Sequence, residues 1–190
     1  MNRRDALSRV ALLVGGSIVG AEFFLSGCTA TEMKAAGLPF TKEDIAYLDE
    51  IAETIIPATG TPGAKAARVG EFMNTMVTDC YDSKDQKIFI DGMARVNEAC
   101  NKAHGHNFMK ASPEHRKEIL TALDKEAKEY QKGKKADDPN HYFQLMKQLT
   151  LLGFFTSETG ATQTLRYSAV PGKYEGCIPY KKGDKAWATS

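Results

Sequence analysis

The chain has 190 residues, of which 25 are Lys or Arg and 24 are Asp or Glu, giving a formal net charge of +1. So balanced a charge produces no global field that points to nucleic acid or to an acidic partner. Of the four cysteines, those that follow residue 28 (Cys80, Cys100 and Cys177) are too few for a disulfide scaffold and fit no zinc spacing. The Cys-x-x-Cys-His motif of covalent haem and the Gly-x-Gly-x-x-Gly motif of FAD sites are absent as well.

Residues 1–27 have the three parts of an export signal: a cationic start, an uncharged apolar stretch and an exit of small residues. Arg3 and Arg4 precede a weakly hydrophobic, glycine-interrupted run, which resembles a twin-arginine signal, although Ala6 stands where phenylalanine is common. An ordinary secretory signal with two adjacent arginines is the alternative. We expect the protein to be exported to the periplasmic face of a membrane.

Leu25-Ser26-Gly27-Cys28 resembles a bacterial lipobox, in which the cysteine thiol accepts the lipid. Acyl chains on Cys28 would anchor the protein to a membrane without a spanning helix. The apolar run is short for a membrane span, and Glu22 lies inside it. A small-residue stretch that happens to end in cysteine is the alternative. Residues 28–40 are small and polar, which suits a tether.

Residues 41–190 are predicted to form one all-α domain of about five helices. Thr41 caps a first helix, whose apolar stripe ends before Pro57 and a compact loop over 57–64. A second helix over 69–82 and a third over 85–104 are expected to form an antiparallel hairpin. In such a hairpin Cys80 and Cys100 would be buried, about 20 Å apart and too far for a disulfide.

A fourth helix begins at Ser112-Pro113-Glu114, with a capping side chain before a proline, and runs to about residue 131. A fifth, over 140–156, has almost no polar face, so it should be central or covered by something else. A further helical turn over 161–167 precedes an irregular tail from about residue 168. Because this tail is rich in aromatic residues, it should lie on an apolar surface, either its own core or a partner.

Three segments resemble the gluconate 2-dehydrogenase subunit 3 family. The first is Thr150-Leu151-Leu152-Gly153-Phe154-Phe155-Thr156-Ser157-Glu158-Thr159-Gly160-Ala161-Thr162. It is followed by Leu165-Arg166-Tyr167 and by Val170-Pro171-Gly172-Lys173-Tyr174-Glu175-Gly176-Cys177. Ile55-Ile56-Pro57 and Thr61-Pro62-Gly63-Ala64 extend the resemblance over most of the chain after the signal.

The resemblance implies a small, non-catalytic subunit that helps a large flavoprotein to fold, to be exported and to be anchored. The large subunit would be an FAD-dependent sugar or alcohol dehydrogenase of the glucose-methanol-choline type, with electrons leaving to a cytochrome c that carries haem c. No cofactor or metal is then expected on this chain. The expected interface residues lie in the fifth helix and the tail: Leu151, Phe154, Phe155, Glu158, Arg166, Tyr167, Tyr174, Tyr180 and Trp187.

Two other function classes remain open. A catalytic chain could use His104, His106 and Glu158, but no carboxylate pair or nucleophile with a base accompanies them at a recognisable spacing. We therefore expect the histidines, His115 and His141 included, to be exposed or capping.

If the helix continued through Gly160, Glu158 and Arg166 would share a helix face and would form an internal ion pair or meet the partner. The third class is an independent periplasmic ligand-binding lipoprotein.

Overall fold

The computed structural model describes residues 40–170, 172–173, 176–177 and 179–188, all within the second of two units, Pro39–Ser190. The predicted twin-arginine pair, the lipobox cysteine, almost all of the predicted tether and Tyr174 lie outside these residues. Regular structure in the described part is helical, apart from an isolated bridge between Arg166 and Trp187. None of the helices described there has the length and apolar character needed to cross a membrane.

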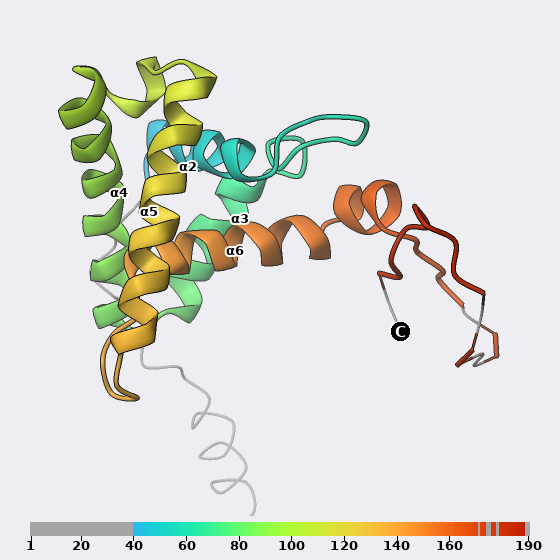
Figure 1. Cartoon of the computed structure of the whole chain (residues 1–190). Helices are drawn as coiled ribbons and strands as arrows, with labels where there is room; N and C mark the ends of the chain where they lie inside the picture. The colour runs from blue at the N-terminus through green and yellow to red at the C-terminus, as the bar shows by residue number, and fades with distance from the viewer. Residues whose placement is uncertain (1–39, 171, 174–175, 178, 189–190) are drawn as a thin grey trace, which may run out of the picture. The chain divides into compact units, whose positions relative to one another are not determined.

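The helices confirm the predicted all-α class (Figure 1). In chain order they are α2 (Lys42–Ile55), α3 (Val69–Thr75), the π-helical turn η1 (Met76–Cys80), α4 (Ser83–His104), the 3-10 turn η2 (Phe108–Lys110), α5 (Pro113–Gly133), α6 (Tyr142–Thr156) and the π-helical turn η3 (Gly160–Thr164).

Side-chain caps set the helix starts. Thr41 accepts a hydrogen bond from the Asp44 amide at 3.2 Å while the Asp44 carboxylate accepts from the Thr41 amide, which is a reciprocal capping box. Ser112 caps α5 in front of Pro113, so both predicted starts are confirmed. α4 begins two residues earlier than predicted because the Asp82 carboxylate caps it.

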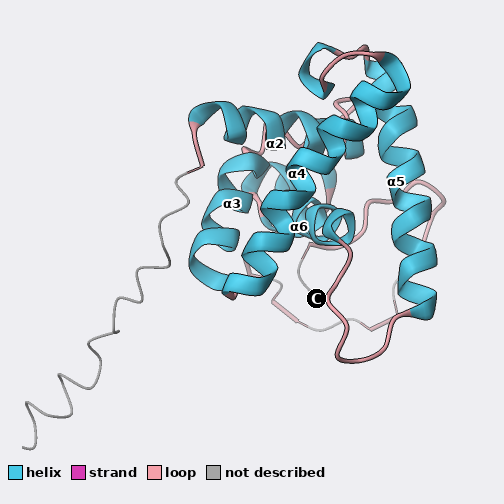
Figure 2. Cartoon of the chain, turned by 90° about the vertical axis from the view of Figure 1, so that its left-hand side faces the viewer, coloured by secondary structure: helices cyan, strands magenta, loops and turns pink. Residues whose placement is uncertain are grey.

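α6 is the central helix of the bundle, as its apolar sequence predicted. It contacts α2, α3, α4 and α5, and Figure 2 shows it end-on among α3, α4 and α5. Its first three turns bury Phe143, Met146 and Leu149 almost completely. Close packing requires small residues at the crossings: a Cβ on Gly92 of α4 would lie 2.6 Å from the Cβ atom of Tyr142 and 2.7 Å from its ring.

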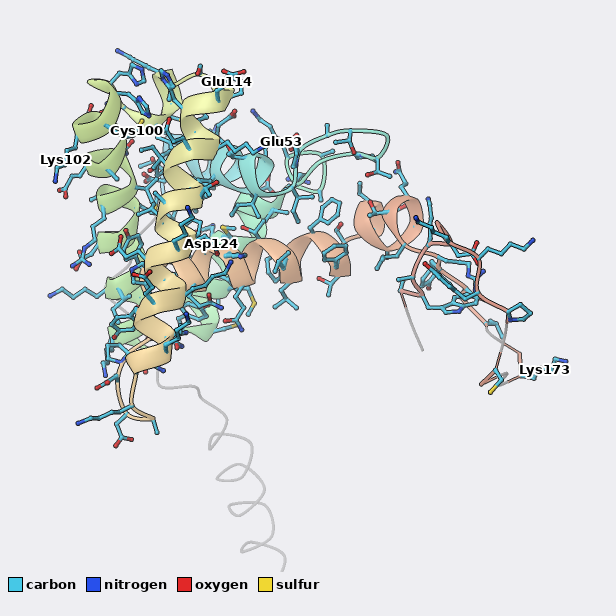
Figure 3. All side chains as sticks on the ribbon, in the orientation of Figure 1. Glu53, Cys100, Lys102, Glu114, Asp124 and Lys173 are labelled. Atoms are coloured by element: carbon cyan, nitrogen blue, oxygen red, sulfur yellow. The ribbon has the colours of Figure 1, made fainter. Side chains whose placement is uncertain are left out.

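The loop after α2 is held by acidic side chains of that helix. Glu53, labelled in Figure 3, belongs to α2. Its two carboxylate oxygens accept hydrogen bonds from the amides of Ala58 and Lys65, each at 2.8 Å. A side chain on Gly63 would overlap this carboxylate. Glu53 therefore holds the loop in place, and the glycine and proline residues of the loop allow the chain to reverse its direction sharply.

The second helix departs from its prediction at its end. It stops at Cys80 rather than at Asp82, and its last five residues form η1. Because a π turn has more residues per turn than an α-helix, it rotates the following side chains, and Cys80 is exposed rather than buried. The predicted antiparallel hairpin forms only at its turn, where η1 contacts α4, whereas α3 packs chiefly on α2 and α6. Cys100 is buried as predicted, and all three described cysteines are free thiols.

Candidate interaction surface

The second half of α6 has one buried face and one open face. Phe154 is 1 % exposed and belongs to the core, so its side chain does not contribute to a docking surface despite its place among the expected interface residues. On the opposite face Leu151, Leu152 and Phe155 are 39–43 % exposed. Leu152 was not among the interface residues expected from the sequence. The adjacent Gly153 packs on Phe72 and so identifies the buried face of the helix.

A sharp bend separates α6 from the tail. The Ser157 hydroxyl donates to the Phe154 carbonyl at 2.6 Å and accepts from the Gly160 amide at 3.0 Å. Gly160 is required here, because a Cβ would overlap the Phe154 carbonyl oxygen. The helical turn after the bend ends at Thr164 rather than at Tyr167.

This bend changes the predicted relation of Glu158 and Arg166. The helix does not continue through both residues, so they do not share a helix face. They form no ion pair with each other within the described residues, and Arg166 has a different partner. The internal ion pair considered from the sequence is therefore wrong for this structure.

Arg166 closes the tail into a loop. Its amide donates to the Ala186 carbonyl at 2.8 Å, and its carbonyl accepts from the Ala188 amide at 2.9 Å. The guanidinium lies 3.7 Å from the centre of the Trp187 ring, a cation–π contact worth about 0.5–1 kcal/mol at an exposed site. Lys185 adds a hydrogen bond from its ammonium to the Gln163 carbonyl. The tail thus returns to its own start.

The described tail does not pack on the core of its own domain. Tyr167, Val170, Tyr180 and Trp187 are exposed, with Tyr180 at 76 % and Val170 at 82 %, and none belongs to the core cluster. The turn η3 connects α6 to the tail, and its main contact is with α6. This part of the chain is coloured orange to red in Figure 1. We call the exposed side chains of this region the C-terminal apolar surface: Leu151, Leu152, Phe155, Tyr167, Val170, Tyr180 and Trp187.

The histidines gather elsewhere, at the corner between α4 and α5. The rings of His104 and His115 are stacked with centroids 3.9 Å apart, and His106 lies 6.1 Å and 5.7 Å from them. These three are half-buried, so the expectation of exposed or capping histidines is wrong for them, whereas His141 caps α6 through its Nδ1 atom. Sequence reasoning missed this stack because it joins two helices.

The stack does not form a metal site within the described residues. Parallel rings turn their faces, not their nitrogens, toward one another, and no set of three or more His, Cys, Asp or Glu residues in the described ranges could hold a metal ion. Cys100 lies 4.0 Å from the Nδ1 atom of His106, and burial raises the pKa of its thiol. Glu158 lies beyond α6 and is not part of this cluster, so the structure does not bring His104, His106 and Glu158 together as one site.

Comparisons with known proteins agree with the resemblance in the sequence. The family model of gluconate 2-dehydrogenase subunit 3 matches residues 42–172, from the start of α2 to the first part of the tail. The match includes α6 and Arg166 but not Tyr180 or Trp187. No curated protein and no solved structure matches the chain. Since the family match covers well over half of the sequence, the chain belongs to the gluconate 2-dehydrogenase subunit 3 family.

Proposed function

We propose that this chain is the non-catalytic small subunit of a membrane-associated, FAD-dependent sugar or alcohol dehydrogenase of the glucose-methanol-choline type. In this role it assists folding, export and anchoring of the flavoprotein subunit. The family name identifies its members as subunits of a dehydrogenase, which supports a dehydrogenase partner. The structural observation that carries the proposal is the uncovered C-terminal apolar surface.

This surface has the character of an interface. Large apolar side chains are exposed on the open face of α6, and aromatic residues are exposed in the tail that follows it. Large apolar groups exposed on a small domain are typical of sites of interaction, and aromatic residues are enriched at the centres of protein interfaces. The sequence left open whether the tail covers its own core or a partner, and the exposure of Tyr167 and Tyr180 supports the partner.

The cofactors are assigned to the other subunits. We place FAD on the large subunit because this chain has no dinucleotide fingerprint. The electrons would then pass to a further subunit that carries haem c. The stacked arrangement of the histidines supports a structural rather than a catalytic role for them.

Export and anchoring rest on the residues that precede the described domain. A flavin enzyme acquires FAD in the cytoplasm, so a large subunit without its own signal would have to cross the membrane folded, in complex with this chain. A lipid on Cys28 would then hold the complex at the periplasmic face of a membrane. Replacing Arg3 and Arg4 by lysine should leave both subunits in the cytoplasm, and normal export of the variant would contradict the twin-arginine route.

The decisive experiment is purification of the tagged chain from its native membranes in mild detergent. We expect a stoichiometric flavoprotein with an FAD spectrum. A double variant, Leu152→Asp with Phe155→Asp, should lose the flavoprotein, whereas Met109→Asp, at a similarly exposed apolar position away from this surface, should retain it. A colourless chain without a partner would instead favour an independent ligand-binding lipoprotein.

A further inference from the structure

The net positive charge of the chain comes from the tail. Residues 166–188 contain five basic and two acidic residues, whereas the whole chain has a net charge of only +1. The remainder of the sequence is therefore slightly acidic, and the tail differs from it in charge as well as in secondary structure.

Two of these charges, those of Lys181 and Lys182, lie on a tight turn. The Lys181 amide donates to the Asp184 carboxylate at 2.9 Å, and the Asp184 amide donates to the Lys181 carbonyl at 3.0 Å. Gly183, with φ of 99°, allows the chain to reverse. Neither Lys181 nor Lys182 forms an ion pair within the described residues.

The charged turn adjoins an exposed aromatic residue. Tyr180, 76 % exposed, directly precedes Lys181, so its ring and the two exposed lysines belong to one short segment. Desolvating an ammonium without a partner is costly, so a surface that receives Tyr180 close to these lysines is favoured if it supplies carboxylates.

We propose that the turn Lys181–Asp184 and Tyr180 dock on an apolar pocket with an acidic rim on the dehydrogenase large subunit. This inference rests on the proposed function and specifies the chemistry of the partner. Lys181 and Lys182 accelerate and orient the encounter, while the C-terminal apolar surface supplies the area that is buried. Charged groups at the rim of an interface act in this way chiefly on the association rate and its salt dependence.

An anionic membrane surface has similar charge chemistry, but the tail fits it less well. Trp187, the side chain best suited to a lipid interface, is covered by the Arg166 guanidinium on one face. The exposed apolar groups Leu151 and Phe155 lie on a helix whose opposite face is fixed in the core, not on an amphipathic helix free to lie in a membrane plane.

The test uses the full-length, tagged chain with its native partner. Complexes captured from detergent-solubilised membranes are washed with NaCl from about 50 mM to about 500 mM, and the retained flavin is measured. We expect wild-type retention to fall with salt. Lys181→Glu with Lys182→Glu should retain at least about tenfold less flavoprotein at low salt, with little salt dependence left.

Matched controls distinguish charge from fold. Lys117→Glu with Lys125→Glu makes the same charge change at exposed positions of α5 and should behave as wild type. Lys181→Arg with Lys182→Arg keeps the charges and should retain the partner. Flotation of non-lipidated Cys28→Ser forms with phosphatidylglycerol vesicles measures any contact with lipid.

The outcomes distinguish a failure of the docking inference from a failure of the proposed function. A wild-type chain that captures no flavoprotein overturns both. A complex that forms but is indifferent to the charge reversal at the turn overturns only the docking inference. If the reversal weakens vesicle binding and leaves the flavoprotein in place, the turn contacts lipid and the inference is wrong.

Discussion

Arg116 joins three elements of the bundle, so its replacement should be one of the most damaging changes outside the apolar core. Its guanidinium donates to the carbonyls of Phe108 and Met109 at 3.0 Å and 2.8 Å and pairs with Glu50 of α2. The Arg116 side chain is only 13 % exposed. Replacing it with Met keeps most of the aliphatic length and removes every donor.

The expected loss follows from these contacts. A hydrogen bond to a charged group contributes about 1.5–3 kcal/mol, and removing one partner of a buried ion pair costs about 3–5 kcal/mol. Glu50 keeps Lys65 as a second partner at 2.8 Å, so its charge is not left alone. We therefore expect Arg116→Met to lower the free energy of unfolding by about 3 kcal/mol and Tm by about 6–12 °C.

Urea denaturation followed by circular dichroism measures this loss. Arg116→Lys keeps the charge but not the planar fork and should give an intermediate value. A double-mutant cycle with Glu50→Gln isolates the interhelical ion pair, and we expect a coupling of at least about 0.5 kcal/mol. A loss below about 1 kcal/mol for Arg116→Met, with an unchanged denaturant slope, would refute the assignment of Arg116 as a structural link.

Three further predictions test other parts of the structure. Burial raises the pKa of Glu50, but the hydrogen bond from a lysine and the charge of a nearby arginine outweigh it and hold the pKa below its usual value. The resulting stabilisation is present above about pH 4.3, the usual pKa of Glu, and is lost as the pH falls through the lower pKa of the folded state. The urea midpoints of Glu50→Gln and wild type should therefore converge in acid, and a difference between the midpoints that stays constant with pH would contradict this. Gly160→Ala must displace the Phe154 carbonyl, so we expect thermal unfolding to show a free energy of unfolding lower by about 1–3 kcal/mol, and we expect weaker capture of the flavoprotein. If neither value changes, the bend is not rigid. A thiol reagent should modify Cys80 quickly and Cys100 only on unfolding, as peptide mass spectrometry can show, and equal rates would place Cys80 in the core.

The sequence determined the features that depend on short-range interactions. The starts of α2 and α5 follow from hydrogen bonds between residues three apart, Thr41 with Asp44 and Ser112 with His115, which a local pattern contains in full. The central place of α6 follows from its lack of a polar face. The family was recognisable because its motif is contiguous around Gly153 and Gly160.

Tertiary structure decided the features that join distant residues or change the helical period. The π turn at Met76–Cys80 moved a cysteine from the core to the surface, and no composition signal marks such a turn. The contact of Arg166 with Trp187 closes a loop of about twenty residues. The histidine stack needs the ends of two helices to meet. Such contacts are decided by which surfaces remain once the core has packed, and a periodic pattern does not encode that outcome.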